Sequence, residues 1–251
     1  LACAEPLNPL SEPCVMVIFG ASGDLTKRLL VPSLYNLACD NLLSPNFAVL
    51  GTGRSKISNE EFRSSMASEE TGLRAFHTRN EFDEEACGEL LERFYFESAN
   101  IDVEGFTQLK QTVEALDKKY QAGGNVLFYF AMAPRFFGGL CENLYKAGFQ
   151  EGDGWKRIIV EKPFGTNLQS ALDLNDEILR YWREDQIYRV DHYLGKETVQ
   201  NLLAFRFANG MFEPLWNKHH IDNIQFNVCE AVDVQGRGGY YDQSGVLRDM
   251  M

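Results

Sequence analysis

Short apolar segments alternate with amphipathic segments along the chain up to about residue 185. The apolar segments are rich in valine, isoleucine and phenylalanine and are bounded by glycine or proline, a pattern typical of buried strands. We predict such strands at 15–19, 47–51, 125–131 and 157–161.

Between these strands, apolar residues recur at the spacing of a helix with one buried face. The clearest case is 104–119, where Phe106, Leu109, Val113 and Leu116 share a face. Further helices are predicted at 26–31, 58–70, 83–99, 136–148, 168–184 and 197–207. Strands that alternate with helices indicate βαβ units. We therefore predict an α/β fold, a Rossmann-like doubly wound parallel sheet.

The pattern changes after residue 185. The segment Ile-Tyr-Arg-Val at 187–190 leads into a polar cluster, and alternation at 221–230 predicts a half-buried strand. A loop is expected at 236–241, followed by the start of a helix at 242–251. We predict one domain over 1–185 and the beginning of a second over 186–251, and we expect the chain to be a fragment.

Composition narrows the possible partners. The 251 residues include 36 acidic and 24 basic ones, for a formal net charge of −12. This balance argues against a nucleic-acid or anionic-membrane partner, and no apolar run approaches the roughly 18 residues of a membrane helix. Cys14, Cys39, Cys141 and Cys229 lie in apolar or helical patterns and are predicted to be buried free thiols, which suits a reducing compartment. No spacing of histidine, cysteine and aspartate residues suggests a metal site.

A glycine turn follows the first predicted strand. Gly20 and Gly23 separate that strand from a helix that opens at Asp24 or Leu25. The backbone N–H groups of such a turn can approach a pyrophosphate, and the helix N-terminus favours its negative charge. The spacing is not a complete G-x-G-x-x-G, so a tight strand-to-helix turn without a ligand stays open as the alternative.

The second strand ends without the acid that holds the ribose of NAD in Rossmann units. Arg54 follows it instead and suits the 2′-phosphate of NADP, which a guanidinium binds in bidentate fashion, while Ser22 can donate another hydrogen bond. We therefore favour NADP as the cofactor, with a solvated loop arginine as the alternative. Tyr129, at the end of the third strand, can contact the cofactor, although a core tyrosine is the commoner outcome.

A second group of polar residues lies shortly after the change of pattern. Asp191, His192, Tyr193 and Lys196 fall within one short window. Clustered ionisable residues mark functional sites only in a fraction of cases. An ion pair of Asp191 with Arg189 or Lys196, and a structural His192, are the alternatives.

Five motifs resemble those of a known family. They are Gly-Ala-Ser-Gly-Asp-Leu-Thr-Lys at 20–27, Glu-Lys-Pro-Phe-Gly at 161–165, Arg-Val-Asp-His-Tyr-Leu-Gly-Lys-Glu at 189–197, Phe-Arg-Phe-Ala-Asn-Gly at 205–210 and Gly-Arg-Gly-Gly-Tyr at 236–240. In this order and spacing the chain resembles the glucose-6-phosphate dehydrogenases. The resemblance covers nearly the whole chain from residue 15. It implies an NADP-binding domain over 1–185 and, over 186–251, the N-terminal part of an α+β substrate domain with a largely antiparallel sheet.

The resemblance also implies a reaction and a site. Members of the family oxidise glucose 6-phosphate at C1 to the 6-phosphogluconolactone and pass hydride to NADP, the first step of the oxidative pentose phosphate pathway. The implied catalytic residues are Asp191, which orients a histidine base, and Lys162, which lies between substrate and cofactor. The implied substrate-binding residues are Lys162, His192, Tyr193, Lys196, Glu230 and Asp249. The implied cofactor-binding residues are Gly20, Ser22, Gly23, Asp24, Leu25, Lys27, Arg54, Tyr129 and Lys162.

The base histidine of the family is expected beyond this sequence. It stands in a pattern like Arg-Asp-Met-Met-Gln-Asn-His, of which Arg248 to Met251 supply the first four residues. We therefore expect the 251-residue chain by itself to be inactive. The resemblance further implies a cytoplasmic protein that forms a homodimer or homotetramer when full length.

Two other functions stay open. Glucose–fructose oxidoreductases, another type of NADP-dependent sugar dehydrogenase, also place Glu-Lys-Pro after a Rossmann strand, so the motif at 161–163 does not separate the two families. The motif at 191–196 favours the first. The remaining alternative is a non-catalytic nucleotide-binding fragment.

Overall fold

The computed structural model describes residues 10–98, 103–191, 193–227, 229, 234, 238–245 and 247. They form two compact units. The first contains the described residues up to Glu161 together with Asp173–Arg189, and the second contains Lys162–Leu172 and the described residues from Val190 onward.

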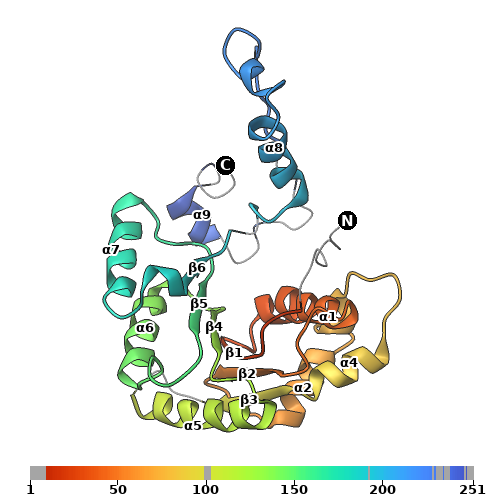
Figure 1. The fold of residues 1–251 in the computed structure, drawn as a ribbon, viewed down its shortest axis with the longest axis vertical. Helices are drawn as coiled ribbons and strands as arrows, with labels where there is room; N and C mark the ends of the chain where they lie inside the picture. Colours follow the sequence, from red (N-terminus) through yellow and green to blue (C-terminus); the bar gives the residue numbers. More distant parts are fainter. Residues whose placement is uncertain are drawn as a thin grey trace, which may run out of the picture. The chain divides into compact units, whose positions relative to one another are not determined.

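A parallel six-stranded sheet forms the centre of the first unit (Figure 1). Its strands are β1 (Cys14–Phe19), β2 (Phe47–Gly53), β3 (Phe94–Ser98), β4 (Val126–Phe130), β5 (Lys156–Val160) and β6 (Ile187–Arg189). They are ordered β3-β2-β1-β4-β5-β6, and every neighbouring pair is parallel. The chain thus proceeds outward from β1 to β3 on one side and from β4 to β6 on the other, which confirms the predicted doubly wound sheet.

The helices lie in the connections between strands and in the second unit. The α-helices are α1 (Val31–Cys39), α2 (Asn59–Ala67), α3 (Leu73–Phe76), α4 (Glu84–Leu91), α5 (Val103–Tyr120), α6 (Phe137–Lys146), α7 (Leu168–Leu179), α8 (Glu197–Phe207) and α9 (Gly238–Ser244). Shorter turns are the π-helical η1 (Thr26–Leu30) and the 3₁₀ helices η2 (Pro134–Phe136), η3 (Glu184–Gln186) and η4 (Glu213–Leu215). None of the helices within the described residues is long and apolar enough to cross a membrane.

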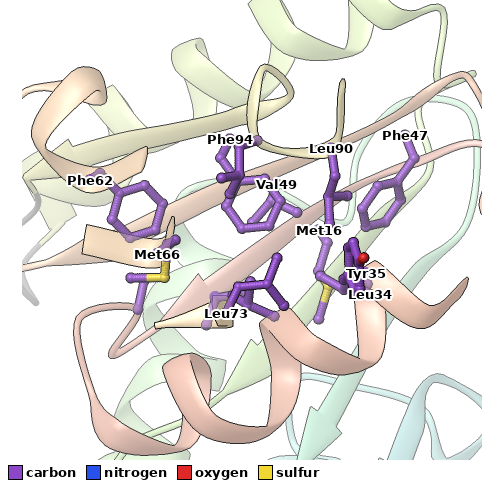
Figure 2. Close-up of a cluster of buried hydrophobic side chains, with 14 of the residues drawn as sticks. Met16, Leu34, Tyr35, Phe47, Val49, Phe62, Met66, Leu73, Leu90 and Phe94 are labelled. Atoms are coloured by element: carbon purple, nitrogen blue, oxygen red, sulfur yellow. The ribbon is translucent and has the colours of Figure 1, made fainter. Parts of the chain in front are cut away.

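Alternate residues of β1 face two separate cores, because side chains of a strand point to opposite faces of the sheet. Met16 and Ile18 lie in a cluster that also contains Tyr35 of α1, Phe62 of α2 and Leu90 of α4. Figure 2 shows this cluster between the sheet and the helices.

The opposite face of the sheet carries a core rich in aromatic rings. Phe19 stacks on Phe106 of α5 at 5.8 Å between ring centroids. Phe130 packs against Phe137 of α6, at 5.6 Å. Helices therefore cover both faces, and all six residues of β1 are buried, as a central parallel strand requires.

Two sequence-based assignments are wrong in this part of the chain. The segment 83–99 was expected to be one helix, but α4 ends at Leu91 and β3 follows. Phe94 and Phe96 alternate with more polar residues, and both become buried when β3 pairs with β2. Cys229 is exposed and Cys39 is half-buried rather than buried, whereas Cys14 and Cys141 are buried free thiols as predicted.

The second unit also departs from the predicted elements. Residues 221–227, expected to begin a half-buried strand, have no regular structure, and 222–227 are exposed. A strand needs a neighbour to pair its backbone groups, and the described part of this unit provides none for them. Residues 238–241, expected to be a loop, belong to α9.

Candidate functional site

The glycine turn brings the end of β1 against the chain that follows β4. Gly20 has a φ of +84°, and a Cβ placed there would lie 2.4 Å from the carbonyl oxygen of Ala131. The Gly20 amide donates to the carbonyl of Thr52 at 3.1 Å, and the Gly23 amide donates to that of Gly20 at 2.9 Å. Only glycine fits the position of Gly20, because other residues avoid positive φ and the space is filled by backbone.

A helix begins directly after this turn. Helical residues run from Asp24 through η1 into α1. The first amide groups of a helix lack partners within the helix and can bind an anion. The predicted strand, glycine turn and helix are therefore present in the expected order.

A pocket of about 380 Å³ opens at the carboxyl ends of β1, β2 and β4. This is the edge of a doubly wound sheet where ligands bind, at the point where the strand order reverses. The described residues that line it are Phe19, Gly20, Ser22, Thr52, Gly53, Arg54, Ser55, Phe106, Met132, Arg135 and Phe136.

Two of the described residues that line the pocket are charged, and both are arginines: Arg54 and Arg135. Both side chains are exposed to solvent at the pocket. Ser22 lies close to the Arg54 loop, since a Cβ on Gly53 would be 4.0 Å from the Ser22 hydroxyl oxygen. The pocket therefore presents positive charge and a hydroxyl where sequence analysis expected a 2′-phosphate.

Other predicted cofactor residues lie around the pocket or elsewhere. Asp24, Leu25 and Lys27 are in the first turns of the helix, where Asp24 forms an exposed ion pair with Arg28 at 3.4 Å. Gly23 shapes the turn. The contacts of these residues with a cofactor stay predictions.

Tyr129 lies in the core beneath this edge of the sheet. Its side chain is 7% exposed and belongs to the cluster between the sheet and helices α1 to α4. Its hydroxyl donates a hydrogen bond to a carboxylate oxygen of Glu161. Burial, followed by the nearby carboxylate, raises the pKa of Tyr129. The core position that sequence analysis held to be commoner is confirmed, and its contact with the cofactor stays a prediction.

A second cluster of charged groups forms within the second unit. The ammonium of Lys162 lies 3.2 Å from Asp191 Oδ2, and the Tyr193 amide donates to Asp191 Oδ1 at 3.0 Å. The Lys196 ammonium lies 4.0 Å from the centroid of the Tyr193 ring, and that of Lys162 lies 5.7 Å from it. The structure thus brings together four of the predicted residues, with the two lysines beside the Tyr193 ring and one of them also beside the Asp191 carboxylate.

The ion pair of Asp191 differs from the alternatives considered from sequence. Arg189 is bound instead to Glu184, at 2.7 Å, and to Asn175, at 2.5 Å. Asp191 pairs with Lys162, which is 29 positions earlier in the chain and follows β5. The predicted residues His192, Glu230 and Asp249 lie outside the described residues.

Sequence analysis missed Arg135 and Phe136 of the pocket. Their signal was available, because Ala133-Pro134 ends the third predicted strand, and residues that follow such a strand lie at the ligand-binding edge. Glu161 was noted only as part of a motif, and its hydrogen bond with Tyr129 depends on the pairing of β4 with β5.

These features define a class: a Rossmann-like α/β protein with a pocket lined by two arginines at the switch point of its sheet. Two family models match the chain, one described as the NAD binding domain of glucose-6-phosphate dehydrogenase over residues 17–201, the other as the C-terminal domain over residues 203–251. The chain belongs to the glucose-6-phosphate dehydrogenase family.

Curated relatives support this assignment. Glucose-6-phosphate 1-dehydrogenase of Streptococcus pneumoniae is 46% identical over 243 residues, which cover 96% of this chain and 48% of the relative. That of Chlamydia muridarum is 42% identical over 254 residues, which cover 98% of this chain and 49% of the relative. The chain thus spans about half the length of the curated relatives it matches.

Solved structures show the same fold. A glucose-6-phosphate dehydrogenase in complex with its substrate glucose 6-phosphate matches with a TM-score of 0.79 and 35% identity, over 97% of this chain and 49% of that one. Glucose-6-phosphate 1-dehydrogenase from Mycobacterium avium matches with a TM-score of 0.75 and 32% identity, over 95% of this chain and 50% of that one.

Proposed function

We propose that this chain is the nucleotide-binding half and the beginning of the substrate-binding half of an NADP-dependent glucose-6-phosphate dehydrogenase. The reaction is the oxidation of glucose 6-phosphate at C1 to the 6-phosphogluconolactone, the first step of the oxidative pentose phosphate pathway. The observation that carries the proposal is the pocket at the glycine turn. Two of its described lining residues, Arg54 and Arg135, are charged, and both are arginines. A homologous structure holds glucose 6-phosphate, which supports the substrate.

The glycine turn fits the pyrophosphate of a dinucleotide. A Cβ at Gly20 would collide with the Ala131 carbonyl oxygen, so only glycine fits there, and its positive φ turns the chain sharply from β1 towards the helix. The amides at the start of that helix bind and orient the negative groups. When bound, the nicotinamide accepts the hydride that leaves C1 of the sugar.

Arg54 supports NADP over NAD. It follows β2, where NAD-binding Rossmann domains carry an acid for the ribose 2′-hydroxyl. A guanidinium there forms charge-assisted hydrogen bonds with a 2′-phosphate, which NAD lacks. Ser22, which lies beside Gly53, supplies a hydroxyl to the same region.

The charged cluster of the second unit supports a sugar-phosphate site. Asp191 forms an ion pair with Lys162 and accepts a hydrogen bond from the Tyr193 amide, and these contacts hold its carboxylate in one orientation. Such a carboxylate is suited to orient a histidine base, as the family motif implies. The ammonium of Lys196 and the hydroxyl of Tyr193 are suited to a phosphate group, which needs several donors.

The test begins with cofactor choice. Arg54→Ala should raise the dissociation constant for NADP⁺ by 10-fold or more and leave that for NAD⁺ little changed, since a charge-assisted pair is worth about 1.5–3 kcal/mol. Calorimetric titration of the 251-residue chain measures both. Equal weakening of the two cofactors would contradict the assignment of Arg54.

The second test is turnover. We expect the 251-residue chain to bind NADP⁺ and to form no NADPH with glucose 6-phosphate, because the family's histidine base is expected beyond Met251. The complete gene product should turn over, as a cytoplasmic homodimer or homotetramer. Turnover by the 251-residue chain near that of the complete product would mean that the base lies within these residues. No turnover by the complete product would favour a non-catalytic nucleotide-binding protein, and preference for another sugar would favour a different sugar dehydrogenase.

A further inference from the structure

A second arginine faces the pocket that we assign to NADP. We propose that Arg135 is a second ligand of the 2′-phosphate and a determinant of cofactor specificity, acting with Arg54. This inference rests on the proposed function and adds to it a residue that lies in neither the glycine turn nor the loop after β2.

The two arginines come from opposite sides of β1. Arg54 follows β2, and Arg135 lies in η2, which follows β4. Because β2 and β4 both pair with β1, with Phe19 opposite Thr52 on one side and Phe130 on the other, the ends of all three strands meet at one edge. The two arginines therefore line one pocket from two different connections, an arrangement that suits two ligands of a single anion.

Charge makes this arrangement informative. The chain has a formal net charge of −12, so a pocket with two arginines among its described lining contrasts with the balance of the whole sequence. Two like charges at one small pocket repel each other unless an anion lies between them. A phosphate monoester carries close to two negative charges at neutral pH and accepts hydrogen bonds from several donors at once.

Local structure holds the Arg135 side chain ready for such a ligand. Its guanidinium lies over the ring of Phe136, 4.9 Å from the ring centroid. A stacked guanidinium keeps its planar edge of N–H donors free for a carboxylate or phosphate. Pro134 precedes it at the start of η2, and the fixed φ of proline limits the backbone there. Less conformational freedom is then lost when the phosphate binds.

The experiment compares three variants of the 251-residue chain by calorimetric titration with NADP⁺ and with NAD⁺. Arg135→Ala should weaken NADP⁺ by about 10-fold and change NAD⁺ little, as expected for one lost charge-assisted contact to the 2′-phosphate. Arg135→Gln, which keeps a polar side chain but removes the charge, should behave likewise and guards against a folding defect of the alanine variant. Arg157→Ala is the matched control, because Arg157 also stacks on an aromatic ring, that of Trp155 at 4.1 Å, but does not line the pocket. It should bind both nucleotides as the parent chain does.

Measuring NADP⁺ affinity over a range of pH adds a test, because a purely structural role of Arg135 would give no such pH dependence. The second ionisation of a phosphate monoester has a pKa of about 6. Below it the 2′-phosphate loses one charge, so the difference in NADP⁺ affinity between the parent and Arg135→Ala should shrink as the pH falls from 7.5 towards 5.5.

The outcomes separate this inference from the proposed function. Equal weakening of NADP⁺ and NAD⁺ by Arg135→Ala would overturn it and indicate stacking of Arg135 on the adenine. Unchanged binding, with Arg54→Ala still selective for NADP⁺, would also overturn it and leave the proposed function standing. A parent chain without preference for NADP⁺ would contradict the cofactor assignment itself.

Discussion

The hydroxyl of Tyr129 donates a hydrogen bond to the carboxylate of Glu161, the residue directly before Lys162. Tyr129 lies in β4, and Glu161 follows β5, the neighbouring strand. Burial and the nearby carboxylate raise the pKa of Tyr129, so the phenol stays protonated and keeps donating through the neutral pH range. The hydrogen bond thereby fixes Glu161 at the carboxyl end of the sheet.

We predict that Tyr129→Phe destabilises the chain. The carboxylate of Glu161 would lose its donor, at a cost of about 1–3 kcal/mol in the free energy of unfolding. Urea denaturation measures this, with Tyr145→Phe as the control because Tyr145 is 50% exposed. Affinity for NADP⁺ should change little, since the hydroxyl is directed to Glu161. A large loss of affinity at unchanged stability would instead place the hydroxyl on the cofactor.

A second prediction concerns Gly20. In Gly20→Ala the new Cβ would meet the Ala131 carbonyl oxygen at 2.4 Å in a residue with positive φ. The conformation alone costs about 1–3 kcal/mol, and the turn must open to relieve the contact. We therefore expect lower thermal stability together with loss of nucleotide binding.

Gly139→Ala is the matched control for Gly20→Ala. Gly139 lies in α6, and a Cβ there would have nothing within 4 Å. Alanine is the better helix former, so this variant should gain up to about 1 kcal/mol and bind nucleotide as before. Equal tolerance of both substitutions in thermal melts and titrations would refute the role given to the turn.

Thiol chemistry provides a third prediction. Burial, with a smaller contribution from Glu12, raises the pKa of Cys14 to about 12, from an ordinary value of 9.0. The reactive thiolate form of Cys14 is therefore absent from the folded chain at pH 8. Iodoacetamide at pH 8 should label the exposed Cys229 and spare the buried Cys14 and Cys141 until denaturant is added, as peptide mass spectrometry will show.

The same shift in pKa gives a pH dependence of stability. The Cys14 thiol ionises more readily in the unfolded chain than in the folded one, so its contribution is complete below about pH 9 and is lost as the pH rises to about 12. The free energy of unfolding should fall over that window. In Cys14→Ala this fall should be smaller, and an unchanged pH profile would contradict the assignment.

The fourth prediction concerns the charged cluster of the second unit and needs the complete gene product. Lys196→Ala should raise the KM for glucose 6-phosphate by about 10-fold or more, because a charge-assisted contact to phosphate is lost. Oxidation of unphosphorylated glucose should stay nearly unchanged. Lys218→Ala, on an exposed turn, is the control. If both substrates suffer equally from Lys196→Ala, its contact with Tyr193 is structural.

Local sequence was sufficient to predict those segments whose structure does not depend on which strand pairs with them. The unbroken apolar run of β1 predicted a strand buried on both faces, and Gly20 predicted a turn that other residues cannot adopt. It failed at 94–98, because whether Phe94 and Phe96 belong to a helix or a strand depends on the edge of β2 beside them. It failed again at 221–227, where alternation alone cannot supply a pairing partner.

The sequence by itself determined the α/β class, the phosphate-type turn and the motifs of the family, because these depend on residue type and on short spacings. Only the tertiary structure decided which distant residues meet. Arg135 joins Arg54 because β2 and β4 both flank β1, and Lys162 joins Asp191 across 29 positions of sequence. Tyr129 contacts Glu161 because β4 and β5 are neighbours. Such contacts follow from strand order and register, which are set by the packing of the whole sheet rather than by any one segment.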